Sequence, residues 1–151
     1  MAEEEVNVPE TEMPSYAIGY SNATKYMKVL YQDVNVLHHN ITGEAFFSNH
    51  EELADMYEDI ADIIDALVEN GMTIGLLEPS IEESLAFKSS IPVKFRNARE
   101  TFEIIVTEFR EAIRLMEIAK QGIPDDIKNK IEEYENTLRI WAEYKANMYL
   151  A

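Results

Sequence analysis

Three histidines, the only ones in this chain, lie within the fourteen residues LHHNITGEAFFSNH, positions 37–50. Thirteen Asp and Glu residues lie between Lys28 and Lys88, a stretch that contains no Lys or Arg. Imidazole and carboxylate donors together suit Fe, Zn or Mn better than soft metals, and the absence of cysteine excludes a thiolate site. The pattern indicates a metal site, whereas the simpler alternative is a solvated acidic face with histidines near helix ends.

The candidate ligands form two pairs that lie far apart in one subunit. His38 and His50 flank a short connection, so their rings could face one point if the flanking helices are antiparallel. Asp65 and Glu69 are four residues apart and project from the same helical face. His50 and Asp65 are separated by about 22 Å, because a helix rises by about 1.5 Å per residue. A two-fold dimer would bring the acids of one copy to the histidines of the other and would create two identical sites.

The periodicity of apolar residues predicts four long helices that must position these ligands. The apolar side chains recur at helical spacing over residues 21–37, 53–67, 95–119 and 127–148. Ser48 and Glu51 have the spacing of a capping box at the start of the second helix, and Asp125 is a candidate cap for the fourth.

The lengths of the connections predict the topology. A long crossover between Gly71 and Pro92 contains its own helical run, SIEESLAFKSS, whereas the other two connections are short. One long crossover between two helical hairpins is the connectivity of ferritin-like bundles. We therefore predict an all-α, ferritin-like four-helix bundle over residues 21–151, with a short helix in the crossover between the second and third helices. Residues 1–20, with two prolines and five glutamates, are expected to form a flexible acidic arm.

Charge and hydropathy exclude several classes of protein. The net charge is −16, with 13 Lys and Arg against 29 Asp and Glu, so the surface attracts cations and repels phosphate backbones. DNA binding is therefore not expected. The 151 residues contain no apolar run long enough to span a membrane and no apolar signal segment. A cytoplasmic protein is expected.

The segment HHNITGEAFFSNHEELADMYEDIADIIDALVENGMTIG, residues 38–75, resembles the signature of the Dps family. These mini-ferritins are named as DNA-binding proteins from starved cells. Their signature has a His, a Gly, a Phe and a second His twelve residues after the first, followed by Asp-x-x-x-Glu. The residues of this chain that match the signature are His38, Gly43, Phe46, His50, Asp65 and Glu69. The segment RIWAEYKANMYL resembles the closing segment of the family, so the likeness extends from about residue 21 onward.

The resemblance implies a hollow dodecamer built from two-fold dimers. Such a shell oxidises Fe(II), preferentially with hydrogen peroxide, and stores the ferric product inside. The implied activity is that of a ferroxidase, with iron as the bound metal and Zn or Mn as substitutes. On this basis the iron ligands are His38 and His50 of one subunit, together with Asp65 and Glu69 of its two-fold mate.

Two positions depart from the family pattern. His39 stands where the family usually has Trp; His39 and Asp62 are further candidate ligands, although an exposed or interface histidine is an alternative for His39. Ala54, one turn after His50, stands where the family usually has a carboxylate ligand, so the centre is expected to be weaker or to hold one metal. Two other functions stay open: a nucleoid-coating DNA-binding protein, and a metal-binding shell whose ferroxidase activity is weakened or lost.

Overall fold

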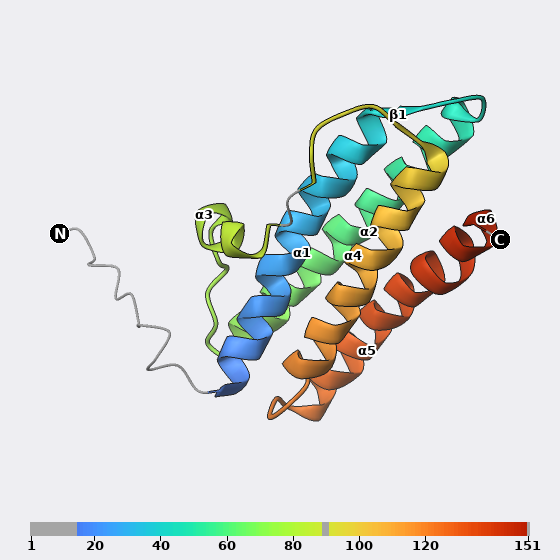
Figure 1. Ribbon diagram of the computed structural model, residues 1–151. Helices are drawn as coiled ribbons and strands as arrows, with labels where there is room; N and C mark the ends of the chain where they lie inside the picture. Colours follow the sequence, from blue (N-terminus) through green and yellow to red (C-terminus); the bar gives the residue numbers. More distant parts are fainter. Residues whose placement is uncertain (1–14, 89–90, 151) are drawn as a thin grey trace.

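The computed structural model describes residues 15–88 and 91–150. Four long helices lie side by side (Figure 1): α1 (Ser15–His39), α2 (Phe46–Thr73), α4 (Ala98–Ala119) and α5 (Asp125–Arg139). The crossover from α2 to α4 contains the short helix α3 (Ile81–Ser84) and the 3-10 turn η2 (Leu85–Phe87), which contact α1. The last helix continues through the π-helical stretch η3 (Ile140–Ala146) into α6 (Asn147–Leu150). The predicted bundle, with its crossover helix, is confirmed.

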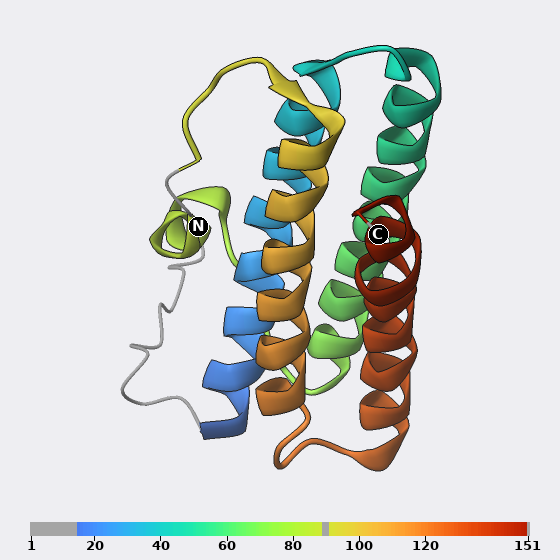
Figure 2. The ribbon, with the colours of Figure 1, turned by 45° about the vertical axis from the view of Figure 1, so that its right-hand side comes forward.

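The helices form two pairs around a common core. Figure 2 shows α1 beside α4 on one side of the bundle, and α2 beside α5 on the other. Each long helix contributes side chains that are almost completely buried: Leu30, Leu53, Phe109 and Ile131. Within the described residues, no helix is both long and apolar enough to cross a membrane.

The first helix begins earlier than predicted. It starts at Ser15 rather than at residue 21, and the buried Tyr20 donates a hydrogen bond from its hydroxyl to the Leu67 carbonyl at 2.5 Å. Residues 15–20 are therefore part of the bundle, because Tyr20 packs against α2. What remains of the predicted flexible arm, residues 1–14, lies outside the described residues.

Two predicted helix caps are wrong. The residue that precedes α2 is Ala45, whose side chain cannot cap, and the Ser48 hydroxyl donates to the Ala45 carbonyl instead of forming a capping box with Glu51. Helix α2 begins at Phe46, so Ser48 already lies inside its first turn. In the same way Asp125 is the first residue of α5, and Pro124 occupies the cap position.

The third long helix begins later than predicted. A parallel pair of two-residue strands, β1 (Ile41–Thr42) and β2 (Arg96–Asn97), ties the α1–α2 connection to the start of α4. The Asn97 side chain then caps α4 by accepting a hydrogen bond from the Glu100 backbone N–H at 2.9 Å. Phe95, predicted on the buried face of this helix, directly precedes β2 and is 76% exposed.

The π-helical stretch changes which side chains of the last helix are buried. A π-helix makes i→i+5 hydrogen bonds, so it shifts the face on which the following residues lie. Trp141 within η3 is buried, and its indole Nε1 donates to the Asp59 carboxylate on α2 at 2.7 Å. Met148, predicted on the buried face, follows the π-helical stretch and is 67% exposed.

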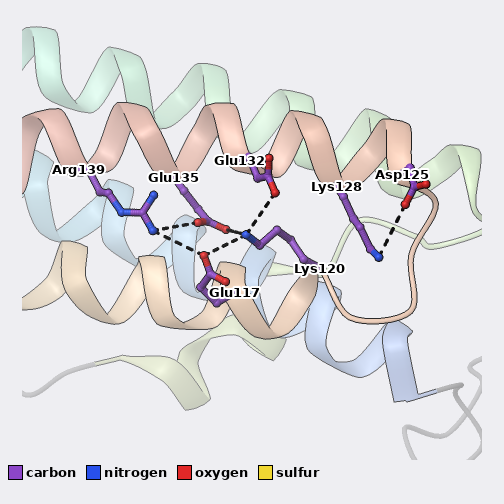
Figure 3. A network of polar contacts seen from close by, with 7 residues as sticks. All are labelled: Glu117, Lys120, Asp125, Lys128, Glu132, Glu135 and Arg139. Atoms are coloured by element: carbon purple, nitrogen blue, oxygen red, sulfur yellow. Dashed lines mark hydrogen bonds and ion pairs between the residues drawn. The ribbon is translucent and has the colours of Figure 1, made fainter.

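A network of charged side chains joins the end of α4 to α5 (Figure 3). Glu135 is 1% exposed, and its two carboxylate oxygens lie 3.1 Å from Lys120 Nζ and 3.2 Å from Arg139 Nη2. Burial, together with a hydrogen bond to the Glu117 carboxylate, raises the pKa of Glu135 to about 7. The same hydrogen bond, with that from Lys120, lowers the pKa of Glu117. The two carboxyl groups therefore share one proton near neutral pH.

Glu135→Gln is expected to flatten the pH dependence of stability between about pH 4.5 and pH 7. In the wild-type protein the folded state retains the Glu135 proton after the unfolded chain has lost it. The contribution of this group to the free energy of unfolding therefore falls as pH rises through that range, by on the order of 3 kcal/mol at most. The lowered pKa of Glu117 acts in the opposite sense, but only below about pH 4.5.

Urea unfolding at pH 5 and pH 8, followed by circular dichroism, measures this effect. Glu132→Gln is the matched control, because Glu132 is exposed and lies 3.8 Å from the same Lys120 Nζ. The control should keep the wild-type loss of stability towards pH 8. A Glu135→Gln protein that loses as much stability as the control would contradict the shared proton.

Candidate metal centre

The end of α1 and the start of α2 bring the three histidines together. The connection between the helices is short, and it turns at Gly43, whose φ of 125° suits glycine. The rings of His38 and His50 stack with their centroids 3.9 Å apart, and the His39 ring lies 4.5 Å from that of His38. His38 and His50 thus meet as their spacing predicted, whereas their role as ligands stays a prediction.

The hydrogen bond of His50 leaves one ring nitrogen available to a metal. Its Nδ1 lies 3.1 Å from the backbone carbonyl oxygen of His38. Because a carbonyl oxygen can only accept, Nδ1 carries the proton of the neutral ring, and the lone pair is on Nε2. Orientation of an imidazole by a carbonyl at one nitrogen is the usual support for metal binding at the other.

His38 lies deeper than the other two histidines. It is 5% exposed, and burial, with the neighbouring His50 and His39 rings, lowers its pKa. The neutral imidazole, which is the form that binds metals, is therefore favoured at neutral pH.

Two aromatic rings pack against this pair, one from Phe46 of the matched signature and one from Tyr57, which was not among the candidate site residues. The ring of Tyr57 lies 5.2 Å from that of His38, and the ring of Phe46 lies 5.2 Å from that of His50. Tyr57 follows His50 by seven residues, two helical turns, so its place on the same face was available from the spacing alone.

The candidate acids lie toward the other end of α2. Asp65 and Glu69 are exposed, as is Asp62. Helix α2 is continuous from Phe46 to Thr73, so the separation of about 22 Å between His50 and Asp65 holds in the structure. In the part of the chain that the structure describes, no group of three or more His, Asp or Glu side chains is close enough to hold a metal ion. One subunit thus presents the two halves of the predicted donor set at separate places.

The exposed face of α2 carries two parallel rows of side chains. One is an acidic row, in which every member is exposed: Glu51, Asp55, Glu58, Asp62, Asp65 and Glu69. The other, which we call the seam, consists of small or apolar side chains that are only half-buried: Ala54, Tyr57, Ala61, Ile64 and Val68. Both rows repeat at intervals of three and four residues, so each runs straight along the helix. The seam lies on the same face of α2 as His50. Its side chains could become fully buried against another helix.

Solved structures of Dps proteins have the same fold as this chain. The protein from Bacillus brevis superposes with a TM-score of 0.81 at 20% identity, over 90% of this chain and 95% of that chain. The protein from Microbacterium arborescens, described in a high iron form, gives 0.81 at 17% identity, over 92% and 97%. The Dps protein from Vibrio cholerae O1, described as a member of a superfamily of ferritin-like diiron-carboxylate proteins, gives 0.79 at 20% identity, over 100% and 98%.

Two other comparisons found no relative of this chain. No protein-family model matches the chain, and no curated protein matches it. At the identities given above, the superpositions establish that this chain has the ferritin-like fold of Dps proteins, which is the fold that its resemblance to that family implied.

Proposed function

We propose that this chain is a mini-ferritin of the Dps family, which binds Fe(II) at sites shared between two subunits, oxidises it and stores the ferric product in a shell. The observation that carries this proposal is the stacked pair His38 and His50, oriented with His50 Nε2 available, at one end of a helix that presents Asp65 and Glu69 toward the other end. Two neutral imidazoles and two carboxylates form a donor set suited to Fe(II).

The seam supports a two-fold pairing of α2 with its copy. In an antiparallel pair, the axis that places His50 opposite Asp65 of the second copy also places Ala54 opposite Ala61. Both pairs are centred on the same point of α2, between residues 57 and 58. Small side chains at both positions allow two helices to approach closely. One symmetry axis thus accounts for the ligands and for the small residues beside them.

Further assembly into a shell is proposed from the resemblance and from apolar side chains left on the crossover. Leu77, Ile81 and Leu85 are all exposed in the single subunit. Exposed apolar side chains such as these are often found on surfaces that another subunit covers. The dodecamer itself is the assembly that the family resemblance implies.

In the proposed reaction, iron is the substrate and hydrogen peroxide the oxidant. Two Fe(II) ions each lose one electron, and one peroxide molecule takes up both electrons and two protons to give two water molecules. The imidazoles and carboxylates hold the cations, and the acidic row with the net charge of −16 attracts them to the protein. Zn or Mn would bind to the same donors in place of iron. The same charge argues against duplex DNA as a partner, and we propose a cytoplasmic location.

Ala61→Arg is expected to give a monomer that binds Fe(II) at least about tenfold more weakly than the wild-type protein. The new side chain would place a bulky cation on the seam and two like charges close to the two-fold axis. Light scattering gives the mass, and anaerobic titration gives the affinity.

Ala61→Ser, which stays small and uncharged, is the control and should remain assembled. The proposal fails if the wild-type protein is a monomer that still binds Fe(II), because the ligands would then have to come from one chain.

A further inference from the structure

His39 is a third imidazole at this end of the bundle, and the proposed reaction makes no use of it. It is the last residue of α1 and it is exposed. Its ring centroid lies 4.5 Å from that of His38 and 6.3 Å from that of His50, so the His38 ring lies between the other two. Three imidazoles therefore gather at one point of the surface.

The His39 ring is free to turn. Within the described residues it contacts the two other histidine rings but makes no hydrogen bond or ion pair. The ring nitrogens do not form a preformed three-ligand site in the described part of the subunit. An exposed side chain changes rotamer within nanoseconds, however, so a cation held by the other two rings could recruit the third.

The donor set lacks a ligand at position 54, and the third imidazole could take its place. Position 54 follows His50 by four residues and lies on the same helical face, but alanine has no donor atom. A cation bound beside His50 therefore lacks a ligand on that side. His39 is the last residue of α1, which packs against α2, and its ring lies 6.3 Å from that of His50.

We propose that His39 is a metal ligand and supplies the donor that Ala54 lacks, so that each site presents three imidazoles from one subunit. The inference rests on the proposed function, because Asp65 and Glu69 of the second subunit complete the site. Three imidazoles select borderline divalent cations, such as Zn(II) and Co(II), over Mn(II), which prefers oxygen ligands. The proposed Fe(II) site would thus have an altered metal preference.

Titration of the full-length assembled protein with Co(II) tests this without measuring oxidation. Visible absorption reports the ligands, and competition with Zn(II) or Mn(II) gives the relative affinities. His39→Phe keeps an aromatic ring but removes the donor. It is expected to weaken Co(II) binding by about tenfold or more, to change the Co(II) spectrum and to reduce the preference for Zn(II) over Mn(II). In paramagnetic proton NMR, the wild-type protein should show three shifted imidazole N–H signals and the variant two.

Two further variants separate the possible results. The double variant His39→Phe with Ala54→Asp should regain affinity, since the new carboxylate replaces the lost donor. His39→Gln provides a second single variant if the phenylalanine disturbs folding. If the single variants bind Co(II) with wild-type affinity and spectrum while His50→Ala does not bind it, His39 is not a ligand and the proposed function stands. If His50→Ala also binds Co(II) normally, both proposals fail.

Discussion

Subunits with His50→Ala, mixed with subunits with Asp65→Ala, are expected to recover iron oxidation that neither variant shows alone. Each single variant damages both sites of its own dimer. In a mixed dimer, one site loses both ligands, whereas the other takes its histidines from the Asp65→Ala subunit and its acids from the His50→Ala subunit. Random reassociation makes half of the dimers mixed, so about a quarter of all sites should be intact.

The experiment needs reversible dissociation, after which stopped-flow mixing with peroxide gives the rate of Fe(II) oxidation. The matched control is a mixture of His38→Ala with His50→Ala. Both ligands lie on the same side of each site, so no mixed dimer contains an intact one and no activity should return. Recovery in the control, or none in the test mixture, would contradict sites shared between subunits. If His50→Ala or Asp65→Ala alone oxidised Fe(II) at the wild-type rate, oxidation would not depend on the proposed site.

Much of the bundle could be predicted from the sequence, because burial imposes a period on each long helix. Leu53 and Phe109 recur in phase with their neighbours, and both are completely buried. The approach of His38 to His50 could also be predicted, since a short connection makes two helices antiparallel and brings those ends together.

The features that were missed depend on contacts between distant residues. The start of α1 is held in place by Tyr20, whose hydroxyl donates a hydrogen bond to the carbonyl of Leu67, forty-seven residues later. A local sequence pattern cannot predict such a contact. The strands β1 and β2 contain two residues each, too few to show an alternating period. The shared proton of Glu117 and Glu135 likewise requires two helices to meet.

The candidate site is harder to predict than the fold, because its proposed donors would come from two copies of the chain. The spacing of His50 and Asp65 in the sequence excluded a site within one subunit but could not show what fills the space between them. The structure adds that Ala54 and Ala61 are half-buried on one continuous seam. In the proposed dimer, the small residue at position 54 would have two effects: it would leave the metal without one ligand, and it would let two helices approach closely.

Ala54→Asp distinguishes these two effects. It is expected to tighten Fe(II) binding by about tenfold or more, since a tenfold gain in affinity requires only about 1.4 kcal/mol of binding free energy from one charged ligand. The side chains at positions 50 and 54 project from one face about 6 Å apart. A carboxylate there would add a negatively charged donor beside His50, and the small Ala61, opposite it in the proposed dimer, would leave room for it. Oxidation by peroxide should become faster, because two iron ions can then be held together.

Ala54→Asn is the matched control, since it has the size of aspartate without the charge. If position 54 faces the metal, the expected order of Fe(II) affinity is aspartate first, with asparagine and alanine similar. If it serves only helix packing, both substitutions should weaken the dimer alike in light scattering, and neither should bind iron more tightly than the wild-type protein. Equal gains for the two variants would mean that size, rather than charge, controls the site. Only tighter Fe(II) binding by the aspartate variant alone would show that Ala54 weakens the metal centre by lacking a charged ligand.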